Sequence, residues 1–318
     1  MKAVVQHRYG APDVLRIEDV ARPVPKDDEI LIRVRAATVS QTDTHARGAH
    51  PFFWRLVAGL RRPKRWQTLG VDLAGEVEAV GSAVTGFEVG DAVFGSPTSY
   101  FGTHAEFVCS RTDRALALKP AGLSFEEAAA VYDGGSQALS ALRQGDVKAG
   151  SRVLIYGASG SLGTAAVQLA KHLGAHVTGV TSTKHVELVR SLGADEVIDY
   201  TQQDFAKAGR TYDVIIDAVG KTTFRRSRRA LDPDGVYVET DGFENVLVWI
   251  GMRLARRKRL RFATGGRSRE YIDVLKQAIE AGAYRPVIDR VYPMDQVADA
   301  HRYVEAWHKT GNVVLTIP

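Results

Sequence analysis

The chain has 318 residues, 45% of them hydrophobic, which is enough to build sizeable cores and indicates two domains. The formal net charge is +5 and the pI is near 9.2, but the excess cations gather in short runs at 61–65, 225–229 and 253–261 without interleaved aromatic residues. We therefore expect solvated faces rather than a nucleic-acid-binding surface. The single cysteine, Cys109, excludes an intrachain disulfide and a cysteine-rich zinc cluster. No signal peptide and no apolar run of membrane-spanning length is recognisable, so we expect a cytoplasmic protein.

The first 120 residues contain short segments of strand type separated by turn residues, which is typical of an irregular β-barrel. These segments are KAVVQH, VLRIEDV, EILIRVRAATVS, LAGEVEAVG, DAVFGS and HAEFVCS. An apolar run, FFWRLVAGL at 52–60, stands between basic residues. It could touch a membrane surface but is too short to span one. We interpret it as a substrate-covering lid or a packed loop.

The pattern becomes helical after Pro120, where residues 124–143 predict a helix. Ser124 and Glu127 have the spacing of a capping box at its start. Strands and helices then alternate from 151 to about 263. In the tail, an amphipathic helix at 269–282 is followed by a strand, a second helix and a final strand, GNVVLTIP. Because this last strand resembles the β-rich start, we expect one domain of 1–121 with 270–318 and a second of 122–269.

A glycine-rich turn follows the first strand of the alternating region, in the sequence RVLIYGASGSLG at 152–163. Glycine permits a tight turn, brings backbone N–H groups close to a pyrophosphate and lets the next helix pack near the sheet. The helix N-terminus adds positive partial charge. Such a pattern alone is a weak signal, and it could simply shape a tight turn. Two consecutive βαβ units surround it, however, so we interpret it as a dinucleotide site.

The end of the second strand indicates which dinucleotide binds. An acidic residue there would accept from the ribose 2′-hydroxyl of NAD and repel a 2′-phosphate. Here the sequence reads VTSTKH from Val180, with no acid before Glu187. Ser182 and Lys184 suit a phosphate, so NADPH is the expected cofactor. Alternatively, Ser182 caps the next helix and Lys184 is only a solvated residue.

Together these features resemble the medium-chain dehydrogenase/reductase superfamily over nearly the full length. The match is carried by YGAPDVLRIEDV, LGVDLAGEVEAVG, GDAVFG, YGASGSLGTAAVQLAK, LGADEVIDY, YDVIIDAVG and HRYVEAWHKTGNVVLTIP. These segments look most like the zinc-free, zeta-crystallin-like quinone oxidoreductases. The resemblance implies an α/β fold with a Rossmann doubly wound parallel sheet and a GroES-like β-barrel catalytic domain.

The resemblance also bears on zinc and on the reaction. In zinc-dependent relatives a cysteine stands at Gln41 and Gly-His-Glu stands at 70–72, where this chain has Gly-Val-Asp. Neither an amide nor a valine replaces those ligands, so we expect no metal. Without a Lewis acid, an already electron-poor quinone or enone is the favoured hydride acceptor. Two alternatives remain: a pathway-specific NADP-dependent reductase or alcohol dehydrogenase, and a non-enzymatic NADPH-binding sensor or structural protein.

The residues expected at the cofactor come from both domains. We expect the pyrophosphate at Gly157, Ser159, Gly160, Ser161, Leu162 and Gly163. We expect the 2′-phosphate near Thr181, Ser182, Lys184 and Tyr200, although Tyr200 could equally be a solvated tyrosine at a strand end. The remaining cofactor candidates are Ala218, Val219, Gly220, Asp241, Gly242, Gln137 and Asn312, the last of which could be an ordinary turn residue.

Several positions depart from the family pattern in segments that face the nicotinamide there. Quinone oxidoreductases usually have asparagine, tyrosine, proline and threonine where this chain has Ser40, His45, Tyr132 and Gln137. Asp133 is also unexpected. We take Ser40, His45, Tyr132 and Asp133 as the catalytic candidates, the last three as possible proton donors.

The expected partners are a small-molecule quinone, enone or related carbonyl substrate and a second copy of the chain, with neither nucleic acid nor membrane. The strand RFATGG is expected at a sheet edge, where pairing with its copy would form a homodimer.

Overall fold

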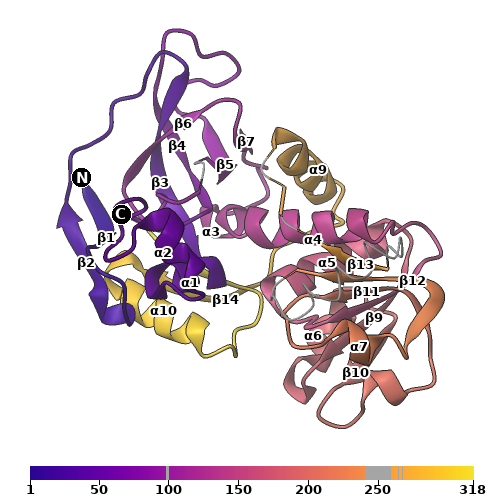
Figure 1. Ribbon diagram of the computed structural model, residues 1–318. Helices are drawn as coiled ribbons and strands as arrows, with labels where there is room; N and C mark the ends of the chain where they lie inside the picture. The colour runs from indigo at the N-terminus through magenta and orange to yellow at the C-terminus, as the bar shows by residue number, and fades with distance from the viewer. Residues whose placement is uncertain (98–99, 241–258, 264, 267) are drawn as a thin grey trace. The chain divides into compact units, whose positions relative to one another are not determined.

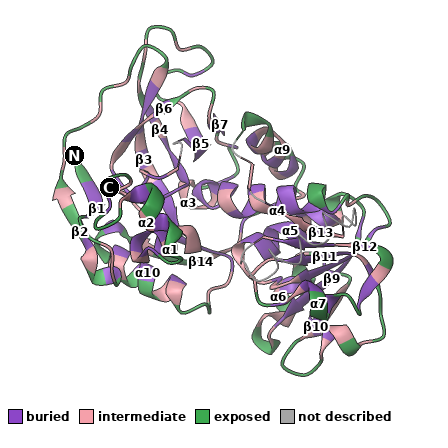
Figure 2. Ribbon diagram, in the orientation of Figure 1, coloured by how far each residue is buried: buried purple, intermediate pink, exposed green. Residues whose placement is uncertain are grey.

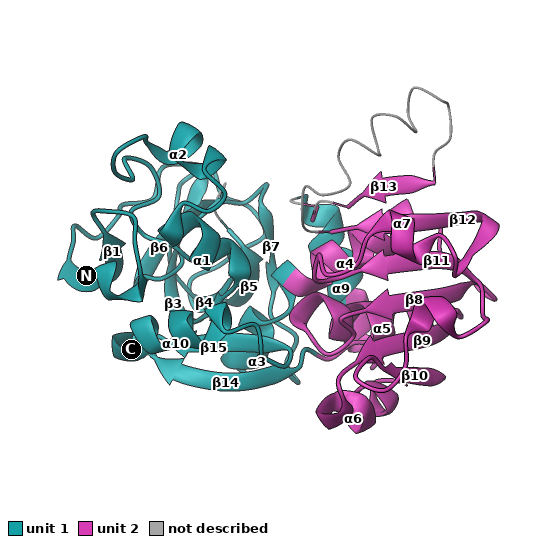
Figure 3. Ribbon diagram, turned by 60° about the horizontal axis from the view of Figure 1, so that its bottom comes forward, with its two compact units in different colours: residues 1–133, 267–276, 286–318 teal, residues 134–266, 277–285 magenta. Residues whose placement is uncertain are grey.

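The computed structural model describes residues 1–97, 100–240, 259–263, 265–266 and 268–318. The chain divides into two compact units, shown in Figure 3. Unit 1 contains residues 1–133, 267–276 and 286–318, and unit 2 contains residues 134–266 and 277–285. The first boundary by contacts therefore falls at 133/134, whereas the sequence pattern placed it at 121/122.

Unit 1 is built on a seven-stranded sheet, in which the strand order is β14-β15-β3-β4-β5-β7 and β6 pairs with β3. A separate antiparallel pair joins β1 and β2. The strands are β1 (Lys2–Gln6), β2 (Leu15–Asp19), β3 (Glu29–Val39), β4 (Leu73–Val80), β5 (Ala92–Ser96), β6 (Phe107–Arg111), β7 (Ala115–Leu118), β14 (Ile288–Pro293) and β15 (Asn312–Thr316), labelled in Figure 1 where there is room.

Apolar residues at alternating positions of β3 and β4 meet the tail of the chain in the core of unit 1. β15 lies between β14 and β3, with Val313 opposite Val39. Helix α10 (Val297–Glu305) packs on β15 and β3, and its Val304 is fully buried. The last strand is thus an interior strand of this sheet, between β14 and the strands contributed by the first 120 residues.

The helical segment predicted at 124–143 contains two helices, α3 (Phe125–Ala129) and α4 (Tyr132–Gln144). The capping box is confirmed: Glu127 Oε2 accepts from the Ser124 N–H at 3.0 Å, and Ser124 Oγ accepts from the Glu127 N–H at 3.2 Å. The first helix ends within two turns because the Val131 N–H bonds back to the Ala128 carbonyl, three residues earlier, and a new helix begins at Tyr132. The elements outside the sheet of unit 1 are η1 (Pro12–Val14), α1 (Gln41–Gly48), α2 (Phe53–Ala58), α3 (Phe125–Ala129), η4 (Met294–Gln296) and α10 (Val297–Glu305), while α4 (Tyr132–Gln144) and α9 (Arg269–Glu280) cross the unit boundary.

Unit 2 is an all-parallel, six-stranded sheet in the order β10-β9-β8-β11-β12-β13, which confirms the predicted Rossmann fold. The central strands β8, β9 and β11 are buried over nearly their whole length, as is typical of a parallel sheet covered on both faces, and Figure 2 shows their buried colouring. The reversal of strand order between β8 and β11 is the position where such sheets bind nucleotides. The elements are β8 (Arg152–Tyr156), α5 (Ser161–His172), β9 (His176–Thr181), η2 (Thr183–His185), α6 (Val186–Ser191), β10 (Glu196–Asp199), η3 (Phe205–Lys207), β11 (Tyr212–Asp217), α7 (Phe224–Ser227), β12 (Leu231–Glu239) and β13 (Leu260–Phe262).

Candidate functional site

The glycine turn of unit 2 follows β8 at the strand-order reversal. Gly157 has φ +84°, and a Cβ there would lie 2.6 Å from Val219 Cγ1. Gly163 packs the start of α5 against the turn so closely that a Cβ would lie 2.1 Å from the Gly157 carbonyl oxygen. The N–H groups of Gly157 and Ala158 both donate to the Val180 carbonyl at 3.0 Å. Side chains are therefore excluded from the floor of the turn.

The start of α5 is open to an anion. Its N-cap, Gly160, has no side chain to bond the first-turn N–H groups, and a Cβ built on it would meet nothing closer than the Gly157 oxygen at 3.6 Å. A twelve-residue helix beginning in this way places positive partial charge and backbone donors beside the glycine turn. The turn fits the pyrophosphate of a dinucleotide. The neighbouring Ser159 hydroxyl accepts from Thr181 Oγ1 at 2.9 Å, which joins the turn to the end of β9.

The end of β9 carries the residues expected at the 2′-phosphate. Ser182 precedes η2 without a side-chain capping bond, and Lys184 is exposed. The Tyr200 N–H donates to the Thr181 carbonyl at 3.0 Å, and its ring is 54% exposed. Ser182 thus occupies the N-cap position of η2, as the alternative interpretation expected, but its hydroxyl makes no capping bond.

One acidic residue near this site was not considered in the sequence analysis. Parallel pairing of β10 with β9 places Asp199 opposite Thr181. Its carboxylate accepts from the Thr183 hydroxyl at 2.6 Å and from the Thr201 N–H and hydroxyl at 2.9 and 2.8 Å. These bonds, with that from Thr183 the strongest influence, lower the pKa of Asp199. Because neighbouring hydroxyls and an N–H already engage both oxygens, Asp199 is less free to accept from a ribose.

A buried aspartate shapes the turn after β11, where Ala218, Val219 and Gly220 were expected to border the cofactor. The Asp217 side chain accepts from the N–H groups of Val219 at 3.1 Å, Lys221 at 3.4 Å and Thr222 at 3.0 Å. It also accepts from the Tyr237 hydroxyl at 3.1 Å. Burial raises its pKa, opposed by these donors. Asp217 was missed in the sequence, where an acid ending an apolar strand just before a glycine turn is the available signal.

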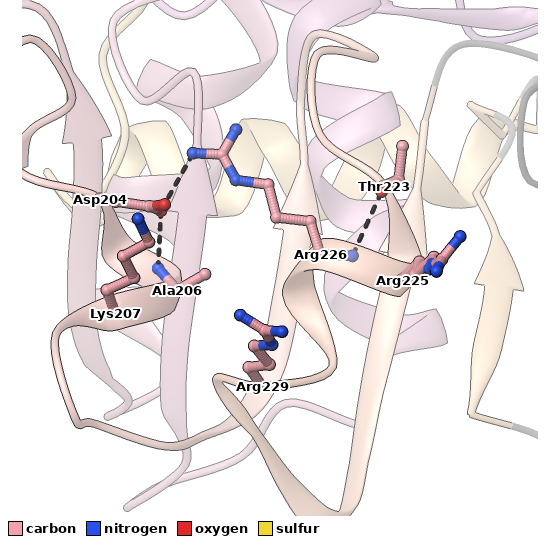
Figure 4. Close-up of a pocket in the computed structure, with 7 residues that line it drawn as sticks. All are labelled: Asp204, Ala206, Lys207, Thr223, Arg225, Arg226 and Arg229. Atoms are coloured by element: carbon pink, nitrogen blue, oxygen red, sulfur yellow. Dashed lines mark hydrogen bonds and ion pairs between the residues drawn. The ribbon is translucent and has the colours of Figure 1, made fainter.

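A cation-lined cavity of about 300 Å³ opens between η3 and α7 in unit 2, as Figure 4 shows. Arg226 donates to Asp204 at 3.0 Å, and its guanidinium lies 5.4 Å from the centre of the Phe205 ring. The residues that line the cavity are Asp204, Ala206, Lys207, Thr223, Arg225, Arg226 and Arg229. Part of the basic run is therefore an exposed positive patch, consistent with the solvated face that we expected.

In unit 1, Ser40 and His45 lie at opposite ends of α1. The Ser40 hydroxyl donates to Asp43 Oδ2 at 2.9 Å, and the Gly70 N–H donates to Asp43 Oδ1 at 2.8 Å. Asp43 is fully buried, so Ser40 is engaged in starting the helix. The half-buried His45 ring lies 6.5 Å from the Trp307 ring, centre to centre.

Tyr132 and Asp133 begin α4 beside a buried carboxyl group. Tyr132 is 2% exposed, and the Asp133 N–H donates to Asp72 Oδ2 at 2.8 Å. Burial, then the charges of Asp133 and Asp43, raise the pKa of Asp72 well above its usual value. Asp72 therefore lies in a cluster of carboxyl groups whose burial and mutual repulsion favour its protonated form.

Lys309 belongs to the same unit and was missed in the sequence analysis. Its Nζ donates to the Gly311 carbonyl at 2.6 Å. Lys309 is half-buried, and this desolvation lowers its pKa to about 8, opposed by the charges of Asp133 and Asp289. A lysine with this pKa can gain or release a proton near neutral pH. Nothing in the sequence distinguishes it from a solvated lysine in a turn.

The remaining cofactor candidates are Asn312, Gln137, Asp241 and Gly242. The backbone N–H and side-chain Nδ2 of Asn312 both donate to the Val287 carbonyl, at 2.8 and 3.0 Å, so this residue helps to hold β15 in place. Gln137 is half-buried in α4 within unit 2. Asp241 and Gly242 lie outside the described residues.

Asp72 gives a pH-dependent prediction for stability. Because its folded-state pKa is raised, its contribution to stability is full below the unfolded value and is lost as the pH rises through the folded value. Asp72→Asn keeps an oxygen for the Asp133 N–H and removes the titration. Relative to the native chain, the variant should gain about 1.4 kcal/mol for each pH unit above 4 until the folded pKa is passed. Urea unfolding between pH 5 and 8 measures this; a difference independent of pH would contradict it.

Comparison with known proteins agrees with this geometry. Residues 26–138 match the alcohol dehydrogenase GroES-like domain, and residues 192–315 match the family of zinc-binding dehydrogenases. The chain is 33% identical to an NADPH-dependent alkenal/one oxidoreductase of Arabidopsis thaliana, over 99% of this chain and 79% of the relative. It is 30% identical to the quinone oxidoreductase of Homo sapiens, over 100% and 98%. The solved quinone oxidoreductase from Coxiella burnetii superposes with a TM-score of 0.90 at 30% identity, over 100% and 99%.

The chain belongs to the medium-chain dehydrogenase/reductase superfamily, in its quinone oxidoreductase branch. The resemblance seen in the sequence is thus confirmed, and the protein is an NAD(P)H-dependent oxidoreductase of the quinone and alkenal/one reductase type.

Two further features of this superfamily member concern metal and membrane. Among the described residues, no group of three or more potential metal-ligating side chains comes together. Gln41, at the position of a ligand in zinc-dependent members, donates from Nε2 to the Val304 carbonyl at 2.9 Å. Within the described part of the chain, no helix is long and apolar enough to cross a membrane.

Proposed function

We propose that this enzyme is a zinc-independent reductase that uses NADPH to reduce a quinone or the activated C=C bond of an enone. The observation that carries the proposal is the uncapped start of α5 above a glycine floor, which suits a dinucleotide pyrophosphate. The full-length similarity to quinone oxidoreductases and to an alkenal/one oxidoreductase supports the acceptor class.

The chemistry divides between cofactor and chain. When bound, NADPH supplies the hydride, which adds to the conjugated acceptor together with one proton to give a hydroquinone or a saturated carbonyl compound. The turn at Gly157 and Gly163 holds the pyrophosphate, and the loop braced by Asp217 borders the cofactor. Because the acceptor spreads the incoming charge over a conjugated oxygen, positioning and a proton donor suffice. His45, Tyr132 and Asp133 remain donor candidates from the sequence.

Lys309 joins them as a further proton donor. Its ammonium form predominates below its pKa of about 8, so kcat should fall as the pH rises above 8. Lys309→Met should lower kcat at pH 7 by about a hundredfold and remove this alkaline limb. Lys309→Arg, which stays charged, should move the limb to higher pH. An unchanged kcat profile in Lys309→Met would exclude the role.

NADPH preference is predicted to depend on Lys184. A charge-assisted bond to the 2′-phosphate contributes about 1.5 to 3 kcal/mol, so Lys184→Ala should raise the Kd for NADPH at least about tenfold and leave that for NADH unchanged. Fluorescence titration measures both constants. Lys148→Ala is the matched control, since Lys148 is 77% exposed in the same unit. A native enzyme that prefers NADH would contradict the prediction.

The acceptor is tested by following NADPH oxidation with a panel of quinones, enones and saturated ketones. Turnover of quinones or enones, but not of saturated ketones, supports the proposal. The altered residues Ser40, His45, Tyr132 and Gln137 favour a dedicated substrate as the second candidate function. Binding of NADPH without turnover of any acceptor would instead favour a sensor or structural role.

We also propose a cytoplasmic homodimer. The strand β13 is at the edge of the six-stranded sheet, where the RFATGG segment was expected, and an edge strand can pair with its copy across a two-fold axis. Light scattering on the purified protein gives the oligomeric state.

A further inference from the structure

The short helix α2 carries an apolar face toward solvent. Trp54 and Ala58, four residues apart, are each 6% exposed and point into unit 1. The opposite face holds Phe53, Leu56 and Val57, which are 41%, 67% and 45% exposed. On an ordinary surface helix this face is polar. Figure 2 shows the exposed colouring of α2.

These residues form a concentrated patch rather than scattered exposed side chains. Of the fourteen large hydrophobic side chains exposed among the described residues, five lie within nine positions: Phe52, Phe53, Leu56, Val57 and Leu60. Singly exposed apolar residues are common on any protein, whereas a contiguous apolar patch usually marks an interaction site.

The segment that presents the patch is firmly built into unit 1. The Trp54 ring meets the rings of Tyr100, Phe101 and Trp66 at 5.6, 6.0 and 6.2 Å between centres. The Tyr9 hydroxyl donates to the Gly59 carbonyl at 2.8 Å, and the Lys64 N–H donates to the Ala58 carbonyl at 2.8 Å. Packing on the inner face thus holds the outer, apolar face in place.

The charged residues in the sequence around the patch have one sign. From Thr44 to Val71 the sequence contains no aspartate or glutamate. Four cationic residues follow α2, all of them exposed: Arg61, Arg62, Lys64 and Arg65. A fifth, Arg55, lies in the helix with its guanidinium 4.8 Å from the centre of the Tyr9 ring. The segment 52–65 therefore combines an exposed apolar face with exposed cations and contains no acidic residue.

We propose that residues 52–65 dock this enzyme on the surface of an anionic phospholipid bilayer. An apolar helix face with aromatic and aliphatic side chains enters the boundary between headgroups and acyl chains, and neighbouring arginines and lysines meet the lipid phosphates. A folded protein partner would need matching shape and specific acceptors, while a bilayer needs only apolar depth and negative charge. The proposal revises the expectation of a substrate lid or packed loop and of no membrane partner. It concerns a surface contact and is independent of the reductase activity.

The test is flotation of the purified protein, without substrate, with phosphatidylcholine vesicles and with vesicles containing 30% phosphatidylglycerol. Binding to the anionic vesicles is expected to exceed binding to the neutral ones at least tenfold and to weaken in 500 mM NaCl. The Leu56→Ser/Val57→Ser variant should bind at least tenfold more weakly to anionic vesicles. Arg61→Gln/Arg62→Gln should lose a similar factor.

Two matched control variants test whether vesicle binding depends on this patch or on exposed apolar and cationic residues anywhere on the surface. Val24→Ser/Val89→Ser removes two residues that are 83% and 65% exposed elsewhere in unit 1, and Lys148→Gln removes an exposed cation of unit 2. Both should bind as the native chain does. Thermal melts show whether each variant is folded.

Three results would overturn the proposal. One is no binding to anionic vesicles, or equal binding to both kinds. Another is unchanged vesicle binding in Leu56→Ser/Val57→Ser with a loss of quinone turnover, which would assign the face to substrate covering. The third is dissociation of a dimer in the same variant with vesicle binding intact, which would assign the face to a second copy of the chain.

Discussion

Replacing Asp217 by alanine is expected to destabilise the protein by about 3 to 5 kcal/mol and to weaken NADPH binding at least about tenfold. The Asp217 carboxylate accepts from the N–H groups of Val219 and Thr222 and from the Tyr237 hydroxyl in a fully buried position. Without it these donors remain buried and unsatisfied, and the loop that they hold loses its shape. Urea unfolding gives the stability, and fluorescence titration of the folded variant gives the NADPH affinity.

A residue on the same strand supplies the control. Asp213 is at the start of β11, where it pairs with Arg152 at 2.6 Å with both side chains 39% or more exposed. Asp213→Ala should cost at most about 1 kcal/mol, because exposed ion pairs contribute little. If Asp217→Ala were no more destabilising than Asp213→Ala, the bracing role of Asp217 would be excluded.

Replacing Arg47 by methionine should destabilise unit 1 by about 3 to 5 kcal/mol. Arg47 is 1% exposed, and its guanidinium donates to the Gly10 carbonyl, the Glu305 carboxylate and, at 3.3 Å, His301 Nδ1. It links the start of the chain, α1 and α10. Burial lowers its pKa to about 10, opposed by the charge of Asp13, so it stays charged at neutral pH.

The measurement for Arg47→Met is again urea unfolding, with NADPH affinity of the folded variant expected to stay unchanged. The stability of Arg47→Lys should lie between that of the native protein and that of Arg47→Met, because a lysine keeps the charge but cannot donate to three partners with the geometry of a guanidinium. Arg302→Met is the control: Arg302 lies on α10, is 47% exposed and pairs with Asp13 and Asp299. An Arg47→Met protein as stable as Arg302→Met would contradict the prediction.

The parts of the fold that could be predicted are those encoded locally. The glycine turn before α5, the alternating strands and helices and the capping box at Ser124 each depend on residues a few positions apart. The segment 124–143 is helical, as predicted, but it is divided into two helices at Val131. The apolar pattern continues through this break, so periodicity carries no signal for it.

The parts of the candidate site that were missed depend on pairing between distant segments. Asp199 reaches the end of β9 only because β10 lies beside it in parallel register. Burial raises the pKa of Asp72, and the charge of Asp133, 61 positions later in the sequence, raises it further, while the hydrogen bond from the Asp133 N–H opposes the shift. Lys309 is an ordinary lysine in the sequence, and its low pKa follows from the burial that the fold creates.

The interior position of β15 also sets an order for biosynthesis. Unit 2 is nearly continuous in the sequence and needs only residues 277–285 from beyond its main stretch. The sheet of unit 1 has a gap between β14 and β3 until Thr316 has left the ribosome. Unit 2 can therefore complete its fold during translation, whereas the end of β3 that pairs with β15, residues 36–39, keeps an unpaired edge until the last residues of the chain emerge.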